Sequence, residues 1–184
     1  YPYNHLGDAL FDVCRLSRGM SHKNAAAGLP CGGAKGVIIA DPSQKSEALF
    51  EAFGEAVDSL QGKYFTAEDV NTTTDDMNQV MHKTQYVVGR DTVSGDPSPF
   101  TAYGTFCGIK ALAKKLYGKD DLNGVKIALQ GLGHVGFDVA KQLAAAGADL
   151  IVSTHSNRKN MDIAVNEWGA KEVTDEELYG VECD

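Results

Sequence analysis

The sequence predicts an α/β protein made of two domains, and three local patterns in its 184 residues support this prediction. An apolar run at 36–40 directly follows a glycine-rich turn and has the length of a short buried strand. The run SGDPSP at 94–99 interrupts the chain just before a long helical pattern. A strand–helix–strand pattern follows that helix and is typical of a parallel sheet with right-handed crossovers. We therefore expect one domain at 1–95 and a second at 96–184.

In the first domain, apolar residues from Leu6 to Leu16 recur at helical spacing and predict a helix that ends at about Arg18. A later helix should begin at a serine cap, Ser43 or Ser46, and should end before Gly62. The other predicted elements are a buried strand at 36–40, short strands at 64–67 and 85–88, and a helix at 74–81.

In the second domain, Ser98 as the N-cap and Pro99 at the first helical position should start a long helix that reaches about Tyr117. We interpret this helix as the link between the domains. The remaining predicted elements are a strand at 125–130, a helix at 133–146, a strand at 148–152 and a helix at 159–168.

Composition and charge exclude several classes of function. A hydrophobic content of 43% is enough for a core, whereas the net charge of −8 and the pI near 5.0 argue against nucleic acid or an anionic membrane as a partner. No apolar run approaches the roughly 20 residues that a membrane-spanning helix needs. The four cysteines and five histidines show no metal-binding spacing. We therefore predict reduced thiols, a cytoplasmic location and no bound metal.

Two lysines, Lys23 and Lys35, lie on either side of a glycine-rich turn at 28–33. Lys35 directly precedes the predicted buried strand, and burial disfavours the charged form of an amine, so its pKa should fall towards neutrality. An amine with such a pKa can give and take protons near pH 7. The spacing alone leaves open a solvated loop whose glycines only turn the chain.

The segment KNAAAGLPCGGAKGVI at 23–38 resembles the signature of the glutamate/leucine/phenylalanine/valine dehydrogenases, a family of amino-acid dehydrogenases. The resemblance extends over nearly the whole chain. It implies that Lys23 binds the substrate carboxylate and that Lys35 is catalytic. The chain has no initiator methionine and stops where this family continues along another strand, so we expect it to be incomplete at both ends.

The segment YFTAEDVNTT at 64–73 ends a predicted strand with two adjacent carboxylates, Glu68 and Asp69. Adjacent side chains on a strand point to opposite faces, so only one of them can face a cleft. The family has a catalytic aspartate in this motif, and the resemblance assigns that role to Asp69. A turn-capping role is the structural alternative. Ala67, two residues earlier on the same face, should then contact the substrate side chain.

The segment QGLGHVG at 130–136 contains GxGxxG between a predicted strand and a predicted helix, the context that indicates a dinucleotide site. Gly131 would allow the tight turn, Gly133 the approach of a pyrophosphate, and Gly136 close helix–strand packing. His134 and Val135 belong to the same predicted cofactor site at the helix N-terminus, although the His134 side chain should be solvated. The second domain is therefore expected to be a Rossmann-type dinucleotide-binding domain.

One expected part of a NAD site is missing, namely an acidic residue about 20 positions further on that binds the ribose 2′-hydroxyl. The second strand ends at Ser153 and Thr154 instead, and these hydroxyls with Arg158 could accept the 2′-phosphate of NADP. We predict that Thr154 contacts the cofactor, and that the cofactor is NAD with NADP possible. The segment SGDPSPFTAYG resembles the family's linker-helix motif, which implies a nicotinamide contact for Thr101; a first-turn helix residue is the alternative.

The resemblance implies NAD(P)-dependent, reversible oxidative deamination of an L-amino acid to a 2-oxo acid and ammonia, in a cleft between the domains of a homo-oligomer. Ala67 favours leucine, valine and isoleucine, because related aromatic-specific enzymes tend to have a glycine there and a methyl group intrudes on a ring. Asn71 favours the alternative, since residues 69–72 resemble phenylalanine or tryptophan dehydrogenases. A nucleotide-binding chain without turnover is the remaining possibility.

Overall fold

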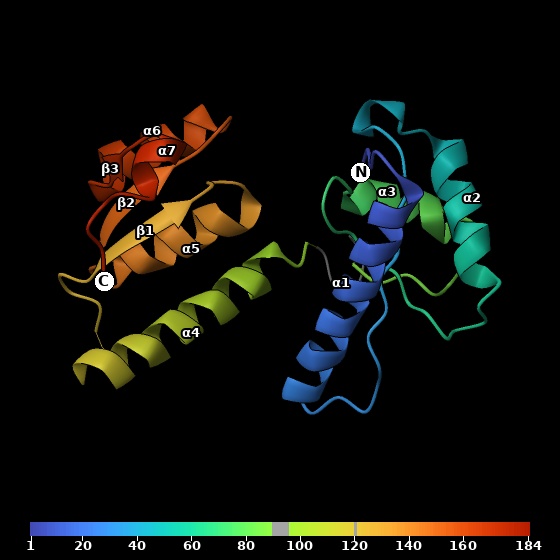
Figure 1. Cartoon of the computed structure of the whole chain (residues 1–184), viewed down its shortest axis with the longest axis horizontal. Coiled ribbons are helices and arrows are strands. Elements are labelled where there is room, and N and C mark those ends of the chain that lie inside the picture. The colour runs from blue at the N-terminus through green and yellow to red at the C-terminus, as the bar shows by residue number, and fades with distance from the viewer. Residues whose placement is uncertain (90–95, 120) are drawn as a thin grey trace. The chain divides into compact units, whose positions relative to one another are not determined.

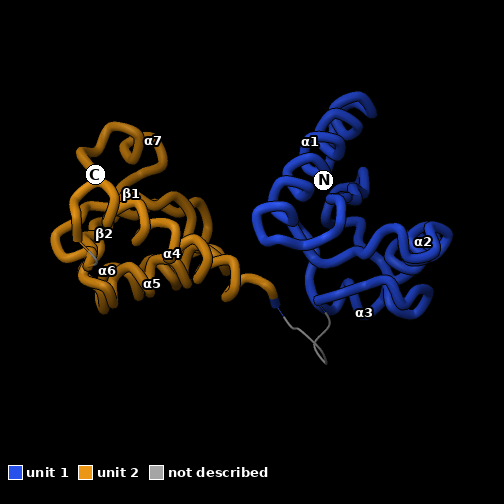
Figure 2. The backbone as a smooth tube through the Cα atoms, turned by 90° about the horizontal axis from the view of Figure 1, so that it is seen from below, with its two compact units in different colours: residues 1–96 blue, residues 97–184 orange. Residues whose placement is uncertain are grey.

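The computed structural model describes residues 1–89, 96–119 and 121–184 (Figure 1). The chain divides into two compact units, Tyr1–Asp96 and Pro97–Asp184, shown in different colours in Figure 2. This division falls one residue from the boundary that the sequence predicts, although the first two residues of the SGDPSP segment, Ser94 and Gly95, lie outside the described residues.

Unit 1 is built mainly from helices. Helix α2 packs against α3, and their contact is the centre of a small core of Phe50, Met77, Val80 and Val87. Side-chain caps explain where these two helices begin, since Ser46 caps α2 and Thr73 caps α3. The elements are α1 (Leu6–Ala26), the 3₁₀ helix η1 (Pro42–Gln44), α2 (Glu47–Asp58) and α3 (Thr74–Met81).

The prediction for α1 was wrong at its C-terminal end. The helix continues past Arg18, through Gly19, to Ala26, and it ends before Gly28, whose φ of +71° does not fit a right-handed helix. Lys23 therefore lies in the last turn of a helix and not in the loop that follows it.

The strands predicted in unit 1 were also wrong. Residues 36–40 are extended but pair with no strand among the described residues, and Ile38 packs on the helical core instead. The runs at 64–67 and 85–88 are reduced to a single parallel bridge between Thr66 and Val87. In this bridge the Thr66 N–H donates to the Tyr86 carbonyl at 3.0 Å, and the Val88 N–H donates to the Thr66 carbonyl at 2.8 Å.

Unit 2 contains a three-stranded parallel sheet in the order β1-β2-β3. The register pairs Lys126 with Asp149 and Gln130 with Ser153, so the carboxyl ends of β1 and β2 lie at one edge of the sheet. Helix α4 packs against α5. The elements are α4 (Ser98–Tyr117), β1 (Lys126–Gln130), α5 (His134–Ala145), β2 (Asp149–Ser153), α6 (Arg158–Trp168), β3 (Lys171–Glu172) and α7 (Asp175–Leu178).

The predictions for unit 2 were confirmed within one or two residues for α4, β1, α5, β2 and α6. The cap of α4 was wrong, since Pro97 is its N-cap and Ser98 its first helical residue. Strand β3 and helix α7 were not predicted, because each is too short to show a hydrophobic period. Across the described ranges, no helix is both long and apolar enough to cross a bilayer.

Candidate active site

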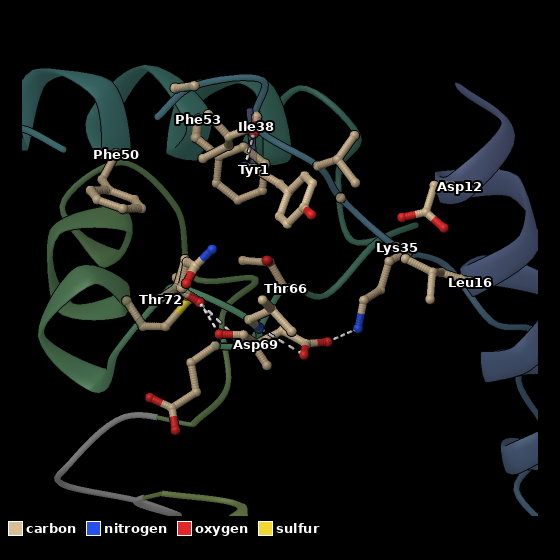
Figure 3. Close-up of a pocket in the computed structure, with 18 of the residues that line it drawn as sticks. Tyr1, Asp12, Leu16, Lys35, Ile38, Phe50, Phe53, Thr66, Asp69 and Thr72 are labelled. Atoms are coloured by element: carbon tan, nitrogen blue, oxygen red, sulfur yellow. Dashed lines mark hydrogen bonds and ion pairs between the residues drawn. The ribbon is translucent and has the colours of Figure 1, made fainter. Parts of the chain in front are cut away.

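A cavity of about 430 Å³ lies within unit 1 (Figure 3). Its walls come from α1, residues 34–41, Pro42 of η1, α2, the segment 64–72 and Met77 of α3. Lys35 and Asp69 supply charge to one part of the wall, whereas Phe50, Phe53 and Tyr64 make another part aromatic. A cavity with both apolar walls and a few polar groups can bind a small molecule that has an ionic end and an apolar side chain.

Lys35 and Asp69 form an ion pair inside this cavity. The Lys35 ammonium donates a hydrogen bond to Oδ2 of Asp69, and the two side chains point towards each other in Figure 3. The Lys35 side chain is 24% exposed and the Asp69 side chain 52% exposed, so the pair is reachable from the cavity. The structure thus brings together the two residues that the sequence selects for catalysis.

The Asp69 carboxylate is held in place by the turn that follows it. Its Oδ1 accepts the N–H of Val70 at 2.8 Å. The Thr72 hydroxyl accepts the Asp69 N–H at 2.7 Å and donates to the Asp69 carbonyl at 3.0 Å. Sequence reasoning missed Thr72, although an aspartate followed three residues later by a threonine is a pattern typical of such turns.

The pKa of Lys35 lies below its ordinary value. Burial of the ammonium is the larger cause, and the positive charge of nearby Lys23 is the second. The direction agrees with the sequence-based prediction, but the burial comes from the cavity wall and not from a strand.

Lys23 is exposed on α1 and is not among the residues that line the cavity. The loop after α1 brings Lys35 close to it, because the loop packs tightly against the helix. The Gly33 N–H donates to the Ser21 hydroxyl at 2.9 Å, and a Cβ at Gly33 would lie only 2.0 Å from the Ser21 nitrogen. The Asn24 amide donates to the Gly32 carbonyl at 2.7 Å. Sequence reasoning identified the glycines but missed these two polar partners on α1.

Ala67 and Glu68 line the same cavity as Asp69. Ala67 is exposed and Glu68 half-buried. The argument that Ala67 and Asp69 share one face of a strand does not hold, since residues 64–67 form only a single bridge. Both residues nevertheless reach the cavity because the irregular segment 64–72 runs along its wall.

In unit 2, the glycine motif forms the turn between β1 and α5. Gly131 has a φ of +91°, which favours glycine, and a Cβ at Gly136 would lie 2.0 Å from the Gly131 carbonyl oxygen. Gly133 is the N-cap of α5, no side chain caps this helix, and no atom lies within 4 Å of where its Cβ would be. The turn therefore offers open space and helix N–H groups, which fits a pyrophosphate.

The other residues of the predicted cofactor site lie around this turn or on α4. His134 is exposed in the first turn of α5, and Val135 packs against the core of unit 2. Thr154 follows β2 and lines a second cavity. Thr101 is exposed in the first turn of α4, where its hydroxyl donates to the Pro97 carbonyl at 3.2 Å. Sequence reasoning missed Asn160, whose amide donates to the Leu132 carbonyl at 2.8 Å and ties the glycine turn to α6.

One group of metal-ligating side chains occurs among the described residues, formed by Glu47, Glu51 and His82. Nδ1 of His82 lies 3.5 Å from a carboxylate oxygen of Glu51 and 3.9 Å from one of Glu47. The Lys83 ammonium lies 3.4 Å from the other oxygen of Glu51, so a side-chain cation already compensates this carboxylate. The four cysteines are free and exposed. The absence of a metal stays a prediction.

Comparison with known proteins relates both units to one family. Residues 2–86 match the family described as Glu/Leu/Phe/Val dehydrogenase, dimerisation domain. Leucine dehydrogenase of Thermoactinomyces intermedius is 50% identical over 188 residues, which covers 100% of this chain and 51% of that protein. L-tryptophan dehydrogenase of Nostoc punctiforme is 42% identical over 183 residues, with 52% of its length covered. The chain thus spans about half the length of the curated relatives that it matches.

Solved structures give the same relationship. The crystal structure of L-tryptophan dehydrogenase from Nostoc punctiforme superimposes with a TM-score of 0.71 at 39% identity, covering 99% of this chain and 51% of that one. A hetero-hexameric glutamate dehydrogenase from Thermus thermophilus shares the fold, with a TM-score of 0.71 at 23% identity over 99% of this chain and 50% of that one. Because the sequence match extends over the whole chain, the chain belongs to the Glu/Leu/Phe/Val family of amino-acid dehydrogenases.

Proposed function

We propose that this chain forms part of an enzyme that catalyses the reversible oxidative deamination of an L-amino acid with NAD or NADP. The observation that supports this most directly is the Lys35–Asp69 ion pair in the wall of a cavity of about 430 Å³. The reaction converts an L-amino acid, an oxidised nicotinamide cofactor and water into a 2-oxo acid, ammonium, the reduced cofactor and one proton.

The proposed steps assign one task to each charged residue. Lys23, which is exposed on α1, provides a counter-charge for the substrate carboxylate. Asp69 accepts a proton from the substrate ammonium, so that the amine can become an imine when hydride leaves the α-carbon. Lys35, whose pKa is lowered by burial, then stabilises the charge that develops when water attacks the imine carbon. The ion pair allows proton exchange between these last two side chains.

We propose that unit 2 is the cofactor-binding, Rossmann-type domain and that unit 1 binds the amino acid. The parallel sheet and the turn from Gly131 to Gly136 support this assignment. A nicotinamide cofactor, when bound, supplies the hydride acceptor. The turn would hold its pyrophosphate at the uncapped N-terminus of α5, and the proposed nicotinamide contact of Thr101 comes from the first turn of α4.

The proposed substrates are the branched-chain amino acids leucine, valine and isoleucine. Relatives named leucine dehydrogenase, at 45–50% identity, support this class, and Ala67 lies in the cavity wall where its methyl group can meet a substrate side chain. Relatives named L-tryptophan dehydrogenase and phenylalanine dehydrogenase, at 42% and 44%, support the aromatic alternative. One methyl group changes discrimination by about 1–3 kcal/mol in an apolar pocket, so the preference should be graded.

A change at Ala67 tests the substrate class. We expect kcat/KM for leucine to exceed that for phenylalanine in the unmodified enzyme, and Ala67→Gly to shift this ratio towards phenylalanine by about 10-fold or more, because a methyl group is removed. Val70→Ala is a control, since it also shortens an exposed residue of the same wall but lies after Asp69. If phenylalanine is the best substrate of the unmodified enzyme, then Asn71 predicts the substrate class correctly and Ala67 does not.

We also propose that the enzyme is a homo-oligomer with a cytoplasmic location. The matched family region is described as a dimerisation domain. On α1, Leu6, Leu10 and Phe11 are 66%, 55% and 72% exposed, and such apolar side chains are typical of a surface that another subunit covers.

A steady-state screen of L-amino acids with NAD and with NADP tests the proposed activity. We expect amino-acid-dependent reduction of the cofactor, with ammonia released in equal amount. Binding of nucleotide without any turnover would favour the alternative of a nucleotide-binding chain that is not an enzyme.

A further inference from the structure

The loop that leads from α1 to Lys35 is tied to one turn of that helix. The Gly33 N–H donates a hydrogen bond to the Ser21 hydroxyl at 2.9 Å, and the Asn24 side-chain amide donates to the Gly32 carbonyl at 2.7 Å. Ser21 and Asn24 are three residues apart, so they lie on the same face of the helix. Two side chains of one helical turn thus hold two consecutive backbone groups at the end of the loop.

Each anchoring residue makes a second hydrogen bond. The Ser21 hydroxyl donates its proton to the Ser17 carbonyl at 3.2 Å, which leaves its oxygen lone pairs to accept the Gly33 N–H. The main-chain carbonyl of Asn24 accepts the Leu29 N–H at 2.9 Å. Asn24 therefore holds the start of the loop as well as its end.

These anchors limit how far Lys35 can lie from α1. Gly33 and Lys35 are two residues apart, and two residues of extended chain span at most about 7 Å. The Gly33 backbone itself lies against the helix, since a Cβ there would overlap the backbone of Met20 and Ser21. The Lys35 backbone is therefore kept near the helical turn that carries Lys23.

Burial alone does not require the polar part of this arrangement. Gly32 is exposed, so water could satisfy its carbonyl as well as the Asn24 amide does. The loop contains three glycines, at positions 28, 32 and 33, and glycine has the greatest backbone freedom of any residue. What the two side chains add is a single position for a loop that would otherwise sample several.

We propose that Ser21 and Asn24 are positioning residues for the reaction, which hold the loop on α1 and thereby keep the Lys35 ammonium close to Lys23 and within the cavity wall. The inference rests on the proposed function, because it gives both residues a part in the chemistry of Lys35. Neither side chain lines the cavity, so each acts through Lys35 and not on the substrate.

The charges around Lys35 explain why its position matters. Burial and the positive charge of Lys23 disfavour the ammonium form and hold the pKa of Lys35 below its ordinary value, whereas the facing Asp69 carboxylate favours the ammonium. Movement of the loop away from α1 would weaken the first two effects and raise the pKa. The tyrosines of the cavity wall, Tyr1, Tyr3 and Tyr64, are neutral near pH 7. The other charged side chains of the wall, which every variant below retains, are Asp12, Arg15, Asp41, Lys45 and Glu68.

Chemical labelling of the purified protein measures Lys35 directly and needs no turnover. Acetic anhydride reacts with a neutral amine, so the acetylation of Lys35 over a series of pH values, read by peptide mass spectrometry, gives its pKa. Lys63, an exposed lysine of the same unit, is the internal reference. In Ser21→Val and in Asn24→Ala we expect the pKa of Lys35 to rise towards its ordinary value, with the labelling of Lys63 unchanged.

Ser21→Thr and Ser21→Val form a matched pair for the steady-state assay. Threonine and valine have nearly the same shape, but only threonine keeps a hydroxyl that can accept the Gly33 N–H. Any effect of the added methyl group is common to both variants. We expect kcat of Ser21→Val to be about 3- to 10-fold below that of Ser21→Thr, the factor that corresponds to one net hydrogen bond. Ser17→Ala is the control and should change neither kcat nor labelling, because the Ser17 hydroxyl donates within α1, to the Val13 carbonyl at 2.7 Å.

The proposal can fail at either residue, and Ser21→Val and Asn24→Ala test it separately if one of them does not fold. Equal kcat and equal Lys35 labelling in the two Ser21 variants would overturn the role of Ser21, and unchanged labelling in Asn24→Ala would overturn that of Asn24. A lower kcat without a change in labelling would also contradict the proposal. If the unmodified protein reduces no cofactor with any amino acid, the proposed function fails, whereas the labelling still tests the anchoring of Lys35.

Discussion

Two glycines of the same motif, Gly133 and Gly136, should differ in how strongly their replacement by alanine lowers stability. A Cβ at Gly136 would lie 2.0 Å from the Gly131 carbonyl oxygen, which is backbone and cannot rotate away. A Cβ at Gly133 would meet no atom within 4 Å, and the φ of Gly133 is −71°, which alanine adopts easily. Gly136→Ala should therefore destabilise unit 2 strongly, whereas Gly133→Ala should cost much less.

The expected magnitudes follow from these contacts. Overpacking typically costs about 1–3 kcal/mol, and a rigid backbone neighbour places Gly136→Ala near the upper end. At about 4–8 °C per kcal/mol for a domain of this size, the melting temperature should fall by at least about 10 °C. Gly133→Ala should lose only about 1 kcal/mol, because alanine is a poorer N-cap than glycine. Its methyl group would, however, occupy the space proposed for the pyrophosphate, so affinity for NAD⁺ should fall by at least about 10-fold.

The assay combines thermal unfolding followed by circular dichroism with calorimetric titration of NAD⁺. Loss of NAD⁺ binding in a Gly133→Ala protein that loses no more than about 1 kcal/mol of stability is the informative result. Unchanged NAD⁺ affinity in that variant would refute the view that the backbone at this turn approaches the cofactor. A melting temperature of Gly136→Ala equal to that of the unmodified protein would refute the argument from close packing.

The remaining predictions concern unit 1. Lys35→Ala should lower kcat by at least about 10². Lys35→Arg should lower kcat as much, because arginine keeps the charge but does not release a proton. A folded variant of either kind with near-normal kcat would remove Lys35 from the mechanism. Asp69→Asn should abolish most turnover in the same steady-state assay while nucleotide still binds. If Asp69→Asn lowers turnover only mildly and Glu68→Gln lowers it severely, then Glu68 is the base. Lys23→Ala should mainly raise KM by removing the counter-charge of the substrate carboxylate, and an unchanged KM would exclude Lys23 from the site.

The sequence predicts best those elements that carry their own local signals. Helix α3 has a capping box, in which Thr73 and Asp76 satisfy each other's backbone groups, and its predicted bounds were confirmed. The bounds of strand β1, helix α5 and strand β2 were also predicted to within one or two residues. The glycine turn separates the apolar pattern of a strand, with a period of two residues, from that of a helix, with a period of 3.6 residues.

The strands of unit 1 could not be predicted correctly, because an apolar run does not specify what will cover it. Residues 36–40 have the composition of a buried strand, but a strand also needs a partner with free backbone groups. In the structure Ile38 packs against the helical core instead, and Thr66 forms a bridge at one position only. Lys35 is nevertheless half-buried, so the prediction of a lowered pKa was correct although its structural reason was wrong.

The position of Glu172 shows why a spacing rule that inspects one strand can miss a carboxylate on the neighbouring strand. The rule looks for an acid at the end of β2, where this chain has Thr154. In a parallel sheet, however, the carboxyl ends of adjacent strands meet at one edge, so β3 can supply the missing carboxylate from Glu172. The same carboxylate pairs with Arg158, which the sequence alone would assign to a 2′-phosphate. One side chain thus engages the arginine that the sequence alone would assign to a 2′-phosphate, and only the pairing of β2 with β3 reveals it.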